Sequence, residues 1–159
     1  MKRSITVPEV EPIPFTQEGF DKISEEQKQL LIDRVDAIGH LQKSRELGDL
    51  KENGYYQASR QKVNAIDARL RRIKFLLKYG IIKEASQSDI VEIGSTVILQ
   101  TNKDKVTYQI VGGEESNPSE GKISHRSPLG KALIGKKVGE EIVLDVPAGK
   151  IIYQLQKIS

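Results

Sequence analysis

The segment Gly48-Asp49-Leu50-Lys51-Glu52-Asn53 lies between two long stretches in which apolar residues recur every three or four positions. The downstream stretch keeps this a/d heptad spacing for about three heptads, which is typical of a coiled-coil helix. Its seam positions are Tyr56, Ser59, Val63, Ile66, Leu70, Ile73 and Leu77. The upstream stretch has a similar spacing at Phe20, Ile23, Gln27, Leu31, Val35, Ile38 and Gln42. Two such helices joined by a short Gly/Asp/Asn segment predict an antiparallel helical hairpin with two acids at its tip.

The chain has 159 residues, no cysteine and a net charge of +3. This length allows one or two small domains, and the absence of cysteine excludes disulfides and zinc–thiolate sites. No apolar run is long enough to span a membrane, and the N-terminus lacks the apolar core of a secretion signal. Residues 1–14, with three prolines, are expected to form an extended leader. We therefore expect a cytoplasmic monomer with no membrane partner.

A different pattern begins after Tyr79-Gly80, where the heptads stop. From Ile90 onward, short β-branched runs alternate with turn sequences, which predicts strands. These runs are 91–100, 105–111, 121–124, 141–146 and 151–157. Residues 127–135 have the sequence of a short helix with Pro128 in its first turn. The predicted fold class is α+β, with the hairpin over residues 15–80 and a small antiparallel sheet wrapped around one short helix over 89–159.

The second arm of the predicted hairpin is strongly basic. Between Tyr55 and Lys83 there are eight Lys/Arg residues and one acid, Asp67, whereas residues 17–47 contain seven acids and five bases. A basic helix face can follow the phosphates of a nucleic acid. It can equally be a solvated face that pairs with the acidic first arm. The sequence leaves both interpretations open.

Two other features carry little chemistry. Residues 130–137 fit the first seven positions of a phosphate-binding loop, but Lys137 stands where a Ser or Thr must meet the metal ion. A turn that ends the short helix is the better interpretation. His40 and His125 lie in different halves with no metal-ligand or catalytic-triad context, so we expect them to be structural or exposed.

The tip acids Asp49 and Glu52 are three residues apart, a spacing that lets both side chains face one way. Two carboxylates suit Mg²⁺, which also needs oxygen ligands from elsewhere. The alternative is that Asp49 caps the second helix and Glu52 favours its positive N-terminal end. Two acids on an exposed tip cannot form a closed catalytic cavity, so any activity would take place inside the site of a partner.

Residues 44–53, followed by Tyr56 and Ala58, resemble the tip motif of the Gre transcript cleavage factors of bacterial RNA polymerase. Thr16-Gln17-Glu18-Gly19-Phe20-Asp21-Lys22-Ile23 is similar to the opening segment of that family. The second half matches the family at 94–97, 110–112, 121–124, 127–133 and 135–139. The resemblance extends over residues 15–158.

The resemblance implies an N-terminal coiled coil and an FKBP-like C-terminal domain. The C-terminal domain would dock on the rim of the polymerase secondary channel, with Ser127, Pro128 and Leu129 at the contact. The acidic tip would then reach the catalytic centre, where Asp49 and Glu52 help to hold a shared Mg²⁺. The polymerase itself would cleave the extruded RNA 3′ segment, so the chain is not expected to be an enzyme. The resemblance also implies that four residues of the second arm face this RNA: Tyr55, Arg60, Lys62 and Arg69.

The tip departs from the family pattern at Gly54-Tyr55, where an acid usual in the family is replaced by an aromatic residue. Tyr55 could stack on a displaced base or be exposed. Three functions remain open: a cleavage-stimulating factor, an inhibitor that binds the same channel without cleavage, and a prolyl isomerase or chaperone suggested by the implied C-terminal fold alone. Fold by itself does not carry function, and residues 89–159 have only Tyr108 and Tyr153 as aromatic residues.

Overall fold

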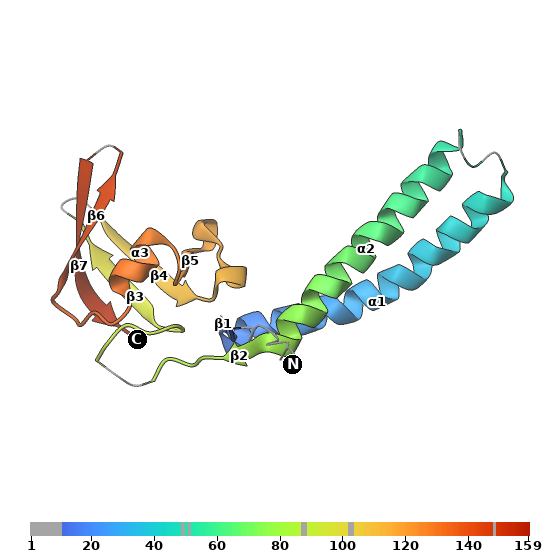
Figure 1. Ribbon diagram of the computed structural model, residues 1–159. Helices are drawn as coiled ribbons and strands as arrows, with labels where there is room; N and C mark the ends of the chain where they lie inside the picture. Colours follow the sequence, from blue (N-terminus) through green and yellow to red (C-terminus); the bar gives the residue numbers. More distant parts are fainter. Residues whose placement is uncertain (1–10, 49, 51, 87–88, 102–103, 148) are drawn as a thin grey trace, which may run out of the picture. The chain divides into compact units, whose positions relative to one another are not determined.

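The structure is a computed structural model that describes residues 11–48, 50, 52–86, 89–101, 104–147 and 149–159. The chain divides into two compact units, and Figure 1 labels their helices and strands on a ribbon coloured by residue number. One unit is the helical hairpin Asp21–Tyr79. The other contains Gly80–Ser159 together with the described residues up to Phe20. The predicted α+β class, a helical hairpin plus a sheet with one short helix, is confirmed.

The hairpin consists of α1 (Gln17–Glu46) and α2 (Gly54–Tyr79), which run side by side in Figure 1. The buried residues of α2 are Ser59, Ile66, Ile73 and Leu76. Tyr56, Val63, Leu70 and Leu77 are half-buried. The predicted seam of α2 is therefore confirmed, and the helix ends at Tyr79, where the heptads stop in the sequence.

The predicted seam of α1 is wrong beyond Gln27. Leu31 and Val35 are 53% and 69% exposed, whereas Ala37 and Ser44 are almost fully buried. The seam instead follows Ile23, Gln27, Leu30, Arg34, Ala37, Leu41 and Ser44. This series keeps strict alternation of three- and four-residue steps, which a straight seam requires. Arg34 stays on the seam because its guanidinium pairs with Asp67 of α2 at 2.6 Å.

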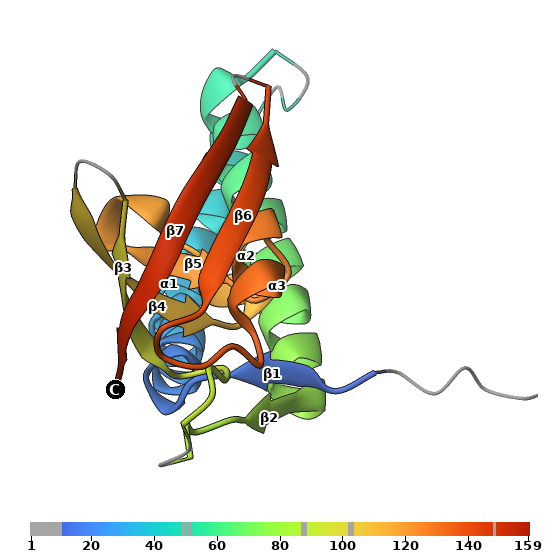
Figure 2. The ribbon, with the colours of Figure 1, turned by 90° about the vertical axis from the view of Figure 1, so that its left-hand side faces the viewer.

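The second unit is built on a five-stranded sheet with the order β5-β4-β3-β7-β6. The strands are β3 (Thr96–Gln100), β4 (Lys105–Val111), β5 (Lys122–Ser124), β6 (Glu141–Val146) and β7 (Gly149–Ile158). Figure 2 shows β6 and β7 as a long antiparallel hairpin. The prediction of an antiparallel sheet holds for three pairings and fails for β5, which runs parallel to β4. Between β4 and β5 the chain makes two single-turn 3₁₀ helices, η1 (Gly113–Glu115) and η2 (Pro118–Glu120), so a hairpin turn does not join these strands.

The short helix α3 (Pro128–Leu133) packs over this sheet. Leu133 is fully buried in one cluster with residues from β3, β4, β5, β6 and β7. The other buried members are Val91, Val97, Leu99, Ile110, Ile123, Ile142 and Leu155. Burial of these aliphatic side chains is the main favourable term for folding of the unit.

A second, two-stranded sheet pairs β1 (Ile13–Phe15) with β2 (Gly80–Ile82) in parallel. The strand begins at Ile13, inside the segment expected to be a leader, whereas residues 1–10 lie outside the described residues. Phe15 is 1% exposed, and its ring meets that of Phe20 edge-on at 6.0 Å. Phe20, expected to start the coiled-coil seam, therefore packs with the sheet unit.

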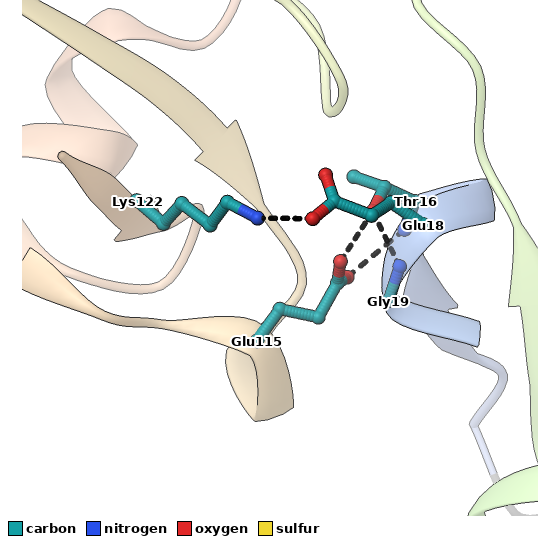
Figure 3. Close-up of polar contacts among 5 residues, drawn as sticks. All are labelled: Thr16, Glu18, Gly19, Glu115 and Lys122. Atoms are coloured by element: carbon teal, nitrogen blue, oxygen red, sulfur yellow. Dashed lines mark hydrogen bonds and ion pairs between the residues drawn. The ribbon is translucent and has the colours of Figure 1, made fainter. Parts of the chain in front are cut away.

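The first turn of α1 is held by polar contacts to the sheet unit (Figure 3). Thr16 caps the helix, because its hydroxyl accepts the backbone N–H of Gly19 at 3.1 Å. The carboxylate of Glu115 accepts the backbone N–H of Thr16, and Lys122 pairs with Glu18 at 2.7 Å. The start of α1 is thus part of the sheet unit, in agreement with the division of the chain at Phe20.

Candidate functional site

The tip of the hairpin joins Glu46 of α1 to Gly54 of α2. Gly48 has a φ of +72°, a left-handed conformation that favours glycine, and its N–H donates to the carbonyl of Arg45 at 3.2 Å. Glu52 is exposed, so its carboxylate is open to solvent or to a partner. Asp49, the other predicted tip acid, lies outside the described residues.

Asn53 organises the tip. Its Oδ1 accepts the backbone N–H groups of Tyr55 at 3.0 Å and Tyr56 at 3.2 Å, which makes Asn53 the N-cap of α2. Its Nδ2 donates to the carbonyl of Ser44 on α1 at 3.2 Å. Asn53 directly precedes the first helical residue and fills the N-cap role that the alternative interpretation gave to Asp49, a residue outside the described ones.

Among the described residues, no three His, Asp or Glu side chains converge as a metal site would require. The described part of the tip thus contributes at most a fraction of an octahedral Mg²⁺ shell, through the oxygens of Glu52. This donor chemistry fits a metal ion that takes its other ligands from a partner. Binding of Mg²⁺ by Asp49 and Glu52 stays a prediction.

The predicted RNA-facing bases of α2 fall into two groups. Arg60 and Lys62 are exposed. Arg69 instead makes a bidentate ion pair with Glu26 of α1, with Nε–Oε1 and Nη2–Oε2 distances of 2.6 Å. Hydrogen bonding from Arg69 lowers the pKa of the Glu26 carboxyl. Arg69 therefore has a partner within the hairpin, which agrees with the interpretation that the basic face pairs with the acidic first arm. The contact of Arg69 with RNA stays a prediction.

Tyr55 is 42% exposed and also has a partner within the hairpin. Its hydroxyl and Nδ1 of His40 on α1 share a hydrogen bond of 2.8 Å. The sequence does not predict this pair, because His40 and Tyr55 are separated by the whole tip. The antiparallel register of the two arms is the signal that brings such residues opposite one another.

The predicted polymerase-binding residues form the start of α3. Ser127 is its N-cap, accepting the N–H of Gly130 at 3.0 Å, and its hydroxyl donates to the carbonyl of Ser124 at 2.7 Å. Leu129 packs against the core of the sheet unit, and Pro128 is exposed. Nearby, His125 helps to line a surface pocket of about 460 Å³ with Lys83, Glu84, Ser86, Glu92, Ile93 and Ile134. Of the three predicted residues, Pro128 is the most available for contact with a partner.

The two units define a class of protein in which a helical hairpin with an exposed acid at its tip is joined to a mixed-sheet domain. Two sequence profiles match the chain: "Transcription elongation factor, N-terminal" over residues 13–82 and "Transcription elongation factor, GreA/GreB, C-term" over residues 86–159. The chain belongs to the GreA/GreB family of transcription elongation factors. The family predicted from the sequence is thus confirmed.

Similar proteins share most of their length with this chain. Transcription elongation factor GreA of Nautilia profundicola is 38% identical over 150 residues, which cover 91% of this chain and 93% of that protein. GreA of a Sulfurovum species is 39% identical with the same coverage. Among solved structures, GreA factor homolog 1 (Gfh1) of Thermus thermophilus is 27% identical, with a TM-score of 0.44 over 93% of this chain and 99% of that one.

Within the described ranges, none of the helices has the length and apolar character needed to cross a bilayer.

Proposed function

We propose that this protein is a transcription elongation factor that binds bacterial RNA polymerase at its secondary channel and stimulates cleavage of the RNA 3′ segment in backtracked complexes. The exposed position of Glu52 on a capped tip is the observation that carries the proposal. Membership of the GreA/GreB family supports it. The hydrolysis would be performed by the polymerase, so the chain itself is not an enzyme.

Each part of the chain has a separate task in this proposal. The sheet unit docks through the start of α3, where Pro128 is exposed. The hairpin carries Asp49 and Glu52 into the channel, and these two carboxylates would hold the shared Mg²⁺. When bound, this ion would stabilise charge on the phosphodiester and lower the pKa of an attacking water. Arg60 and Lys62 would lie near the phosphates of the extruded RNA.

The test uses end-labelled RNA in a stalled, backtracked complex of the cognate polymerase with Mg²⁺. We expect the protein to accelerate release of a 3′ fragment, and Asp49→Ala combined with Glu52→Ala to abolish the acceleration while polymerase binding persists. The control is Glu25→Ala combined with Asp36→Ala, which removes the same charge from exposed positions of α1 away from the tip. A double tip variant that stimulates as well as wild type would disprove the mechanism.

The second candidate is an inhibitor that occupies the channel without promoting cleavage. It is favoured by Tyr55, which stands where the family usually has an acid and is engaged by His40. This function predicts slower nucleotide addition and no added cleavage in the same assay. Elongation at the unmodified rate in the presence of saturating protein would exclude it.

A further inference from the structure

A polar contact joins the two arms of the hairpin just below the tip. His40 lies in the second-last turn of α1, and Tyr55 is the second residue of α2. Besides the 2.8 Å hydrogen bond, their rings meet edge-on, with centroids 6.3 Å apart and planes at 86°. We refer to the His40–Tyr55 pair as the clasp.

Among the described residues at the level of the clasp, no large apolar side chain of the seam is fully buried, since Leu41 and Tyr56 are only half-buried there. The buried residues of the seam there are Ala37, Ser44 and Ser59, whereas Ile66 and Ile73 fill the seam farther from the tip. The small side chains leave a hollow of about 240 Å³, lined by Ala37, His40, Tyr55, Ala58, Ser59 and Lys62. Because hydrophobic stabilisation scales with the apolar area buried, polar contacts have a larger share in holding the arms together near the tip.

The clasp acts on a part of the backbone that needs restraint. Helix α2 begins at Gly54, and glycine loses the most conformational freedom on ordering. Tyr55, the residue after Gly54, is held by two hydrogen bonds. Its N–H donates to Asn53 Oδ1 at 3.0 Å, and its hydroxyl shares a hydrogen bond with His40 of α1. Because Glu52 directly precedes Asn53, a shift of the first turn of α2 also displaces the Glu52 carboxylate.

We propose that the clasp is a positioning device that holds Glu52, the described acid of the tip, in the geometry used for transcript cleavage. Tyr55 then acts through the tip backbone and not by stacking on RNA. This inference rests on the proposed function. Small errors in placement matter because a displacement of about 1 Å can lower a catalysed rate on the order of a hundredfold.

The first experiment compares Tyr55→Phe with wild type in the RNA cleavage assay. The variant keeps the ring and removes the hydroxyl. We expect the maximal stimulated rate to fall about three- to tenfold, as loss of one hydrogen bond allows, while the protein concentration for half-maximal stimulation stays the same. His40→Ala should have the same effect, and the double variant should lose no more than either single variant. Tyr79→Phe, which removes the same hydroxyl at the other end of α2, is the matched control.

The second experiment measures amide hydrogen exchange at Glu52 and at Tyr55–Gln57 in the free protein. Tyr55→Phe and His40→Ala should speed this exchange, whereas Tyr79→Phe should not. Wild-type exchange and wild-type cleavage in Tyr55→Phe would overturn the inference. Cleavage lost in Tyr55→Ala but retained in Tyr55→Phe and His40→Ala would overturn it in favour of stacking. If the wild-type protein does not stimulate cleavage but Tyr55→Phe and His40→Ala still speed amide exchange, the clasp restrains the tip and only the proposed function is rejected.

Discussion

Glu115 and Thr16, separated by 99 positions in the sequence, are joined by two hydrogen bonds. The backbone N–H of Thr16 donates to Oε1 of Glu115 at 2.9 Å, and the Thr16 hydroxyl donates to Oε2. Oε1 also accepts the backbone N–H of Gly112 at 3.1 Å. Since Thr16 is the N-cap of α1 and is 7% exposed, Glu115 fixes the start of this helix on the sheet unit.

Removal of this carboxylate should destabilise the sheet unit. Glu115→Ala leaves two backbone N–H groups and one hydroxyl without their acceptor, so we expect the free energy of unfolding to fall by about 2–3 kcal/mol. Urea denaturation, with hydrogen exchange at the fully buried Ile110 and Leu155 as the local probe, measures the change. Glu120→Ala, at an exposed acid of the neighbouring 3₁₀ helix, should have almost no effect. Equal losses in the two variants would contradict the assigned role of Glu115.

Gly112 is required because β1 passes very close to it. A Cβ at this position would lie 2.1 Å from the carbonyl oxygen of Pro14, so one of the two backbones must move. We expect Gly112→Ala to lower stability by about 1–3 kcal/mol, as is usual for overpacking. Gly113→Ala is the control, since its Cβ would meet nothing closer than 3.9 Å. Thermal unfolding of the two variants side by side tests the close approach.

Loss of the cap at Asn53 should loosen the tip. Asn53→Ala removes the acceptor for two N–H groups of α2 and the donor to Ser44, and we expect a cost of about 1 kcal/mol. Asn53→Asp retains the acceptor and should recover most of the loss. Asn64→Ala, at an exposed position in the middle of α2, provides the comparison in urea denaturation. No difference between Asn53→Ala and Asn64→Ala would show that the cap contributes nothing.

The Glu26–Arg69 pair should make the stability of the hairpin depend on pH. The pKa of Glu26 is lowered from 4.5 by hydrogen bonding and charge attraction from Arg69, so the unfolded state binds the proton more readily. The contribution of the pair is therefore present above pH 4.5 and disappears as pH falls through the lower folded pKa. Because both side chains are more than one-third exposed, the contribution is at most about 1 kcal/mol and decreases with salt.

Glu26→Gln should accordingly destabilise the hairpin at pH 7 and leave it unchanged at a pH well below the folded pKa of Glu26. Denaturation curves at both pH values test the difference. Glu25→Gln is the matched control, because Glu25 pairs with Lys28 on the same helix and not across the arms. A Glu26→Gln effect of the same size at both pH values would rule out the ion pair as its cause.

The sequence predicted one arm of the coiled coil better than the other, and the reason is physical. On α2 the apolar residues themselves follow the three-four rhythm, so periodicity and burial agree. On α1 the apolar side chains of Leu31, Ile32 and Val35 lie on the exposed face, and Arg34 lies on the seam. Apolarity alone could not set the phase of α1, because Asp67 of the other arm stabilises Arg34 there.

At the candidate site, the sequence identified the tip and its acids but not the contacts that hold them. Asn53 was expected only as part of the turn, and His40 only as a structural or exposed residue. Both gain their roles from residues across the hairpin, Ser44 and Tyr55. The roles of Asp49 and of Ser127, Pro128 and Leu129 toward a polymerase remain predictions.

The amino-acid sequence by itself determined the helices, most strands, the proline in the first turn of α3 and the family, because these depend on local periodicity, turn chemistry and ordered motifs. Tertiary structure alone decided the parallel pairings of β1 with β2 and β4 with β5, the phase of α1 and the bond between Thr16 and Glu115. Each of these joins residues that are distant in the chain or chooses among several equivalent partners. Local propensities are the same for every such choice, and only the packing of the complete fold distinguishes them.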